Sequence, residues 1–148
     1  MATTTLYPVA DVGTPGWDTT TAADPFPHYT EIDEGTASPN DADWIETTTA
    51  DDVDIFSFGA TPANTDTVTQ VNVSIRGKLT DGGSVAHIHC ELWHTGDTVQ
   101  VGTTKSIAGA DFGGYGTLGT AADLSWTGLT LTKAQADSLR LHLIFKVA

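Results

Sequence analysis

The sequence predicts an all-β protein, an antiparallel β-sandwich of jelly-roll type with an extended N-terminal arm. After residue 43, apolar and polar residues alternate with a period of two, the pattern of half-buried strands. Thr occupies 26 of the 148 positions and Gly occupies 15, a composition that favours strands and turns over helices. Roughly seven or eight short strands joined by Gly and Asp turns are typical of a two-sheet sandwich.

The first 40 residues differ from the rest, and we interpret them as an arm (residues 1–40) attached to a sandwich domain (residues 41–148). Five of the six prolines lie in this segment, and proline cannot donate to a β-ladder, so a central strand is excluded. Aromatic side chains recur along it, unlike a disordered tail. We expect it to lie extended on its own domain or on a neighbouring subunit, through the anchors Tyr7, Trp17, Phe26 and Tyr29.

Within the sandwich, residues 53–59 carry apolar residues on both faces, which predicts a strand covered on both sides. Residues 71–76 alternate between inward Val or Ile and outward polar side chains. An Asp-Gly-Gly turn within residues 78–84 leads to a strand at 86–92, whose inward face includes Cys90. We expect a turn at 95–97 and another strand at 99–103.

The C-terminal part continues this pattern. Residues 109–121 are rich in glycine and predict a long loop, and residues 124–131 carry apolar anchors of a further strand. Residues 133–137 are expected to form one helical turn capped by Thr132. Residues 139–147 predict the clearest strand, with apolar residues inward at every second position and Arg140, His142 and Lys146 outward.

The charge distribution excludes several classes of partner. The net charge is −13, and residues 1–75 hold 13 acids and no Lys or Arg. Phosphate backbones and anionic membrane surfaces repel such a chain, so we expect neither nucleic-acid nor membrane partners. No apolar run approaches the ~20 residues of a membrane span. The single cysteine excludes an internal disulfide framework and a four-cysteine zinc site.

One strand carries residues with chemical potential. Alternation places His87, His89, Glu91 and Trp93 on the same face. Two histidines and a carboxylate are ligand types that zinc prefers, so His87, His89 and Glu91 are candidate metal ligands, which His142 could join from a neighbouring strand. The alternative, which we prefer, is a subunit contact patch containing Trp93 and His142, because Trp is enriched in interface hot spots. We therefore expect no bound cofactor.

A second candidate ion site lies in the acidic stretch between residues 41 and 54. Its aspartates, Asp41, Asp43, Asp51, Asp52 and Asp54, offer oxygen ligands to calcium, but the EF-hand spacing is absent and a solvated loop is the simpler interpretation. The sequence has no G-x-S-x-G elbow, P-loop or dinucleotide fingerprint. We expect no catalytic residue and no enzymatic activity.

Four segments together resemble a known group of proteins: residues 9–17, 29–34, 40–45 and 54–59. They are similar to segments of small virion accessory proteins of tailed phages and related viruses, in which an arm precedes a jelly-roll sandwich. The resemblance covers most of the chain, but its motifs are short. The strand with His87, His89 and Trp93 departs from the group.

The resemblance implies a structural role without catalysis, on the virion and more on the capsid surface than on the tail. The leading expectation is a capsid decoration (cement) protein that binds the major capsid protein, or another virion protein, as a homo-oligomer, with a trimer favoured. A tail or head-fibre component is the alternative within virion proteins. From a different class, a carbohydrate-binding module would use an exposed Trp93, Trp126 or Trp44 to stack on sugar rings.

Overall fold

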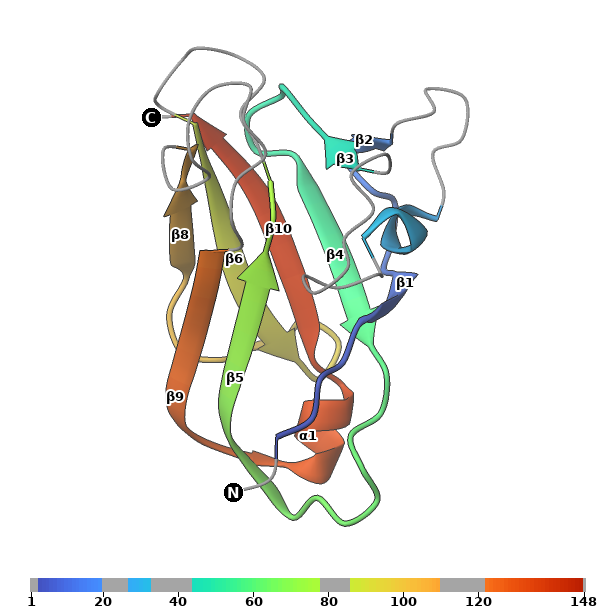
Figure 1. Ribbon diagram of the computed structural model, residues 1–148, viewed down its shortest axis with the longest axis vertical. Helices are drawn as coiled ribbons and strands as arrows, with labels where there is room; N and C mark the ends of the chain where they lie inside the picture. Colours follow the sequence, from blue (N-terminus) through green and yellow to red (C-terminus); the bar gives the residue numbers. More distant parts are fainter. Residues whose placement is uncertain (1–2, 20–26, 33–43, 78–85, 110–121, 148) are drawn as a thin grey trace.

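A computed structural model describes residues 3–19, 27–32, 44–77, 86–109 and 122–147, and it confirms the all-β antiparallel sandwich (Figure 1). The larger sheet has six strands. Five of them follow one another in the order β1 (Pro8–Asp11), β4 (Val53–Phe58), β10 (Arg140–Val147), β6 (Ala86–His94) and β7 (Val99–Gln100). The sixth, β8 (Lys105–Ala108), pairs with β6 on the same side as β7. The second sheet pairs β5 (Thr67–Ile75) with β9 (Ala122–Thr132) and lies across one face of the larger sheet. A small third sheet pairs β2 (Asp18–Thr19) with β3 (Ile45–Glu46).

The strand order follows from long-range pairing. The C-terminal strand β10 lies between β4 and β6, and β5 pairs with the much later β9. Connections of this kind, which return the chain to an earlier strand, are typical of Greek-key sandwiches. Among the described residues the second sheet contains two strands, so the jelly-roll topology stays a prediction.

The core lies between the two sheets. Leu141 of β10 is paired with Phe56 of β4 on one side and with Leu92 of β6 on the other, so one row of apolar side chains crosses three strands. Cys90 is fully buried in the next row, as predicted. Burial raises the pKa of its thiol to about 12, which keeps it protonated and unreactive. The inward positions predicted for the last strand are confirmed except at its end, where Val147 is exposed.

β9 changes the spacing of its apolar residues in mid-strand. Gly128 has a φ of +69°, a left-handed conformation that glycine adopts readily, and the register with β5 shifts at this point. In a regular strand, side chains an odd number of positions apart point to opposite faces. The bulge interrupts this alternation, so the apolar side chains before and after Gly128 all face the core. These residues are Leu124, Trp126, Leu129 and Leu131.

Two local predictions are confirmed. The turn after β6 exists, and Thr95, Gly96 and Asp97 all have positive φ. The single helical turn is α1 (Lys133–Asp137), where the Thr132 side chain and the side chain of Gln135 cap each other's backbone N–H.

The strand expected at 99–103 is shorter, because β7 ends at Gln100 and Gly102 turns the chain with a φ of +67°. The turn predicted within residues 78–84 and most of the loop predicted at 109–121 lie outside the described residues.

Of the two surfaces left open for the N-terminal segment, its own domain or a neighbour, Trp17 and Tyr29 lie on its own domain. We use the term strap for residues 12–19 and 27–32 together with residues 44–46, whose strand β3 pairs with β2; the strap also contains η1 (His28–Glu31). Trp17 belongs to the protein's own core, and Tyr29 packs against it. Tyr7 is exposed, and Phe26 lies outside the described residues. Trp17 and Tyr29 therefore share one core with the sandwich, whereas Tyr7 does not.

Gly16 lies close against the backbone of β4, and its amide donates to the Val53 carbonyl oxygen at 3.0 Å. A Cβ at this position would lie 2.9 Å from the Val53 amide nitrogen and 3.0 Å from its carbonyl oxygen. We expect Gly16→Ala to lower the free energy of unfolding by about 1–3 kcal/mol, because neither backbone can move away cheaply. Gly59→Ala is the control: its Cβ would meet the Val9 side chain at 3.8 Å, an ordinary contact. Equal urea midpoints for the two variants would contradict this close approach.

Candidate functional site

A buried polar cluster joins the strap to the sheet. Alternation along β4 places Asp54 on the same inward face as Phe56, opposite Leu143 of β10. An aspartate at such a position loses its hydration, which costs several kcal/mol unless other groups replace the lost water. The His28 side chain takes the place of that water by contacting Asp54. Both residues are deeply buried, each only 1% exposed.

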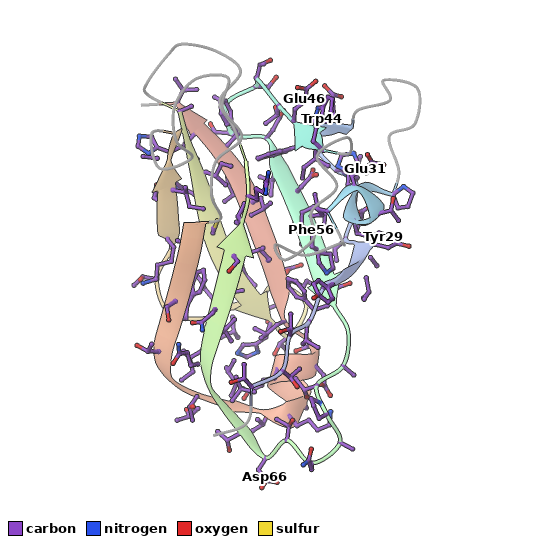
Figure 2. All side chains as sticks on the ribbon, in the orientation of Figure 1. Tyr29, Glu31, Trp44, Glu46, Phe56 and Asp66 are labelled. Atoms are coloured by element: carbon purple, nitrogen blue, oxygen red, sulfur yellow. The ribbon has the colours of Figure 1, made fainter. Side chains whose placement is uncertain are left out.

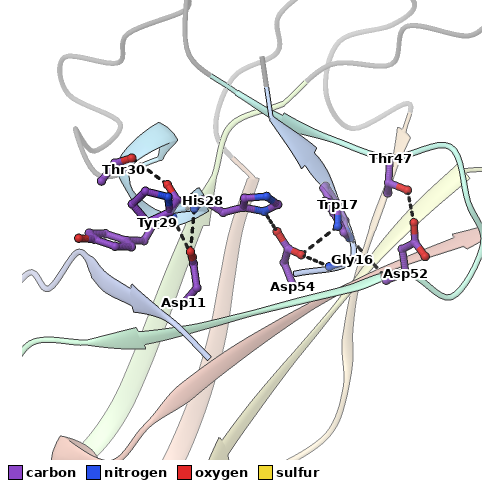
Figure 3. A network of polar contacts seen from close by, with 10 residues as sticks. Asp11, Gly16, Trp17, His28, Tyr29, Thr30, Thr47, Asp52 and Asp54 are labelled. Carbon is purple, nitrogen blue, oxygen red and sulfur yellow. Dashed lines mark hydrogen bonds and ion pairs between the residues drawn. The ribbon is translucent and has the colours of Figure 1, made fainter. Parts of the chain in front are cut away.

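The geometry satisfies both carboxylate oxygens of Asp54 (Figure 3). Oδ2 lies 2.5 Å from Nδ1 of His28, and Oδ1 accepts from the backbone N–H of Gly16 at 2.7 Å and of Trp17 at 3.0 Å. We call this arrangement of His28, Asp54 and the two amides the clamp. The clamp groups are buried and paired, and they hold the strap against β4.

A second aspartate supports the clamp. Asp11, at the end of β1, accepts from the backbone N–H of His28 at 2.7 Å and of Tyr29 at 2.9 Å, and so fixes the start of η1. The Trp17 indole N–H donates to the carbonyl oxygen of Asp52 at 3.2 Å. Polar groups as well as packing thus attach the strap to β1, to β4 and to Asp52, which comes just before β4.

The aspartates considered as a calcium site have separate partners. Asp51 pairs with Lys146, Asp52 accepts from the Thr47 hydroxyl at 2.6 Å, and Asp54 belongs to the clamp. Asp41 and Asp43 lie outside the described residues. Nothing in the described geometry supports calcium binding by this stretch.

The opposite face of the larger sheet carries the residues that the sequence singled out. β6 and β10 are neighbours, and His142 is paired directly with Glu91. The Trp93 ring stacks on His142 with centroids 5.7 Å apart, so the structure brings together the two residues predicted as a contact patch. Glu91 accepts from the Trp93 indole N–H at 2.9 Å and from the Thr104 hydroxyl at 2.8 Å.

The metal hypothesis for His87, His89 and Glu91 is not supported. The three side chains share a face, as predicted, but both oxygens of Glu91 are already hydrogen-bonded. In the part of the chain that the structure describes, no group of three or more His, Cys, Asp or Glu side chains could hold a metal ion.

Asp97 closes this face from the turn after β6. Its Oδ1 lies 3.0 Å from Nε2 of His142, and its other oxygen pairs with Arg140. Burial by itself raises the pKa of Asp97, but hydrogen bonds and charge from His142 and Arg140 outweigh it and hold the pKa below its ordinary value.

This lowered pKa predicts a pH dependence. Asp97 stabilises the fold above its unfolded-state pKa of about 3.9, and the contribution is lost as pH falls through the lower pKa of the folded state. We expect the difference in urea midpoint between the wild type and Asp97→Asn to be full at pH 6 and to shrink below pH 4. Asp66→Asn, at an exposed position just before β5, controls for the loss of one charge. A difference that did not change with pH would contradict the prediction.

Sequence reasoning missed the clamp. A signal was present, because Asp54 occupies an inward position of the apolar stretch at 53–58, where a carboxylate requires a partner. The identity of the partner was not available, since 26 positions separate it from His28.

Comparisons with known proteins give no relative from which a function could be inferred, so function is inferred from the sequence and the geometry. Scans of protein-family models, curated proteins and solved structures each found no match to the chain. Among the described residues, no helix has the length and apolar character needed to cross a membrane.

Proposed function

We propose that this protein is a non-enzymatic virion structural protein, a capsid decoration protein that binds the capsid surface through its N-terminal edge. Its partner is the major capsid protein or another virion protein, and it acts as a homo-oligomer, for which we favour a trimer. The observation that carries the proposal is the way the clamp holds the strap against β4 while the chain just before it stays exposed.

That exposed segment is the start of the chain and β1. Tyr7 is 46% exposed and Val9 is 49% exposed, and both lie at one edge of the larger sheet. β1 has only four residues, begins with Pro8 and contains an irregular register, features that protect an edge from indiscriminate strand pairing. Contact through the two side chains, fixed by a rigid support, limits the entropy that binding costs.

Charge supports the same role. The 13 acids of residues 1–75 have no basic residue among them, so neighbouring copies repel one another over this half of the chain. A protein repeated densely over a shell gains from such repulsion, because it stays soluble and does not aggregate away from its binding sites.

The test must leave the core intact. Deletion of residues 1–40 would remove Trp17 and His28 from the interior, so loss of binding by that deletion would be uninformative. We expect the double substitution Tyr7→Ser with Val9→Ser to reduce binding to shells of the cognate major capsid protein at least tenfold, with the melting temperature nearly unchanged. Val99→Ser is the matched control, because Val99 is 46% exposed on β7 at another edge of the sheet.

Cosedimentation of the purified protein with empty shells measures this binding. Absence of wild-type cosedimentation, or wild-type binding by the double variant, would overturn the proposal. Finding the protein on the tail of a reconstructed particle would favour the tail or head-fibre alternative.

The structure leaves fewer tryptophans for the carbohydrate-binding alternative than the sequence implied. Trp126 is 3% exposed, and its indole N–H donates to the carbonyl oxygen of Thr103, so it cannot stack on a sugar. Trp93 already stacks on His142. Trp44, 41% exposed beside β3 at one end of the molecule (Figure 2), is the candidate that stays accessible. Glycan binding that is lost in Trp44→Ala would favour this alternative.

A further inference from the structure

The face of the larger sheet that points away from the core has an unusual centre. Side chains alternate along β4, β6 and β10, so every second residue of each strand lies on this outer face. We define the outer patch by the members of this face that are apolar, aromatic or histidine, all of them half-buried: Val53, Ile55, His87, His89, Trp93, His142 and Ile144. Outward positions of a solvated antiparallel sheet are ordinarily polar, so such a centre indicates a contact surface.

Strand register makes the patch continuous. Ile144 is paired with Val53 on one side and with His89 on the other. In the next row, His142 is paired with Ile55 and with Glu91. The stacked Trp93 ring extends the patch along β6.

Paired charges surround this centre. Arg140 and His142 share Asp97, and Lys146 pairs with Asp51. Glu91 lies within the patch, opposite His142, and accepts from the Trp93 indole and the Thr104 hydroxyl. An aromatic and aliphatic centre within a polar rim is the usual anatomy of a protein interface. Because Arg140 and Lys146 already have carboxylate partners, covering the patch would not leave either cation unpaired at its edge.

Charge balance indicates what covers the patch. The chain carries −13, and residues 1–75 contain acids alone, so two copies repel each other over much of their surface. Around the outer patch, two cations (Arg140 and Lys146) stand among three acids (Asp51, Glu91 and Asp97), so repulsion nearly cancels there.

The outer face of the β5–β9 sheet is a poorer candidate. At its centre Gln70, Asn72 and Ser125 hydrogen-bond to one another, with distances of 2.7–3.2 Å. These side chains are polar and exposed, so covering them would remove little apolar area from water.

We propose that the outer patch is the surface through which copies of this chain associate. This inference rests on the proposed function, which requires the protein to be an oligomer. Copies meet at the outer patch, while the edge at Tyr7 and Val9 binds the shell.

Sedimentation equilibrium of the full chain tests the proposal with one disruptive and one control substitution. Ile144→Asp places an unpaired charge at the centre of the patch, and Thr127→Asp places one on the exposed outer face of β9. We expect an oligomeric mass for the wild type and Thr127→Asp, and the monomer mass for Ile144→Asp at the same concentration, a loss of at least 100-fold in association.

A second variant keeps the test decisive if Ile144→Asp proves unfolded by near-ultraviolet circular dichroism. His89→Asp replaces one polar outer side chain by another and should weaken association at least tenfold. A wild type that is monomeric at the highest concentration reached, or variants at both positions that keep the oligomeric mass, would overturn the proposal.

Shell binding separates this inference from the proposed function. A wild type that binds shells as a monomer would leave the decoration role standing and refute the patch. An oligomer that dissociates in Ile144→Asp but never binds shells would do the reverse.

Discussion

Replacing His28 with alanine should lower the free energy of unfolding by about 3–5 kcal/mol, the cost of breaking a buried pair and leaving its partner uncompensated. The reason is the position of Asp54, which is 1% exposed on the inward face of β4 and contacts the His28 side chain at 2.5 Å. Two backbone amides would still bond to its other oxygen, but they cannot replace the contact at 2.5 Å.

A double-mutant cycle with Asp54 isolates this interaction. His28→Leu and Asp54→Leu should each destabilise the protein strongly, and the combined variant should cost less than the sum of the two by about 1–3 kcal/mol. Urea unfolding followed by tryptophan fluorescence measures all four proteins, because Trp17 adjoins the clamp. Strict additivity would mean that the imidazole and the carboxylate do not act as a pair.

Replacing Trp17 with alanine should cost about 3–5 kcal/mol of stability, as deletion of a large buried aromatic side chain usually does. Trp17 is 9% exposed and belongs to the same core cluster as Phe56 and Leu141. If the first 40 residues were an appendage that acts only on a neighbour, the same substitution would leave the isolated protein unchanged.

Tyr7→Ala is the matched control for this prediction. Tyr7 is an aromatic residue of the same N-terminal segment but is 46% exposed, so its removal should change the free energy of unfolding by less than about 0.5 kcal/mol. Chemical denaturation of both variants at low protein concentration, where self-association is absent, makes the comparison. A small effect at Trp17 or a large one at Tyr7 would contradict the assignment of strap and edge.

Local pattern was sufficient wherever neighbouring residues determine structure. The alternation in residues 86–92 and 139–147 predicted which side chains are buried, and Cys90 and Leu141 lie in the core accordingly. The cap at Thr132 depends on residues three positions apart, and it was predicted for the same reason. The bulge at Gly128 was not predicted, because its function is to correct the phase of β9 against β5, a distant strand.

The candidate site divides along the same line. The shared face of His89, Glu91 and Trp93 follows from alternation on one strand, whereas the stacking of Trp93 on His142 required β6 and β10 to be neighbours. From the sequence, His142 could be placed near Trp93 only on the assumption that the two strands are neighbours. The sequence kept a metal site as the less favoured alternative, because ligand types on one strand do not reveal that other side chains already hydrogen-bond to the oxygens of Glu91.

The sequence alone determined that this chain forms antiparallel strands, which residues of each strand turn inward, and that its acids crowd the first half. Tertiary structure decided what the N-terminal segment does. Its prolines and aromatic residues fit an arm on any apolar surface, its own or a neighbour's, because local propensity carries no information about the partner. The inward carboxylate of Asp54 selected the protein's own sheet, since only there could His28 and the strap amides take the place of the water that the carboxylate lost on burial.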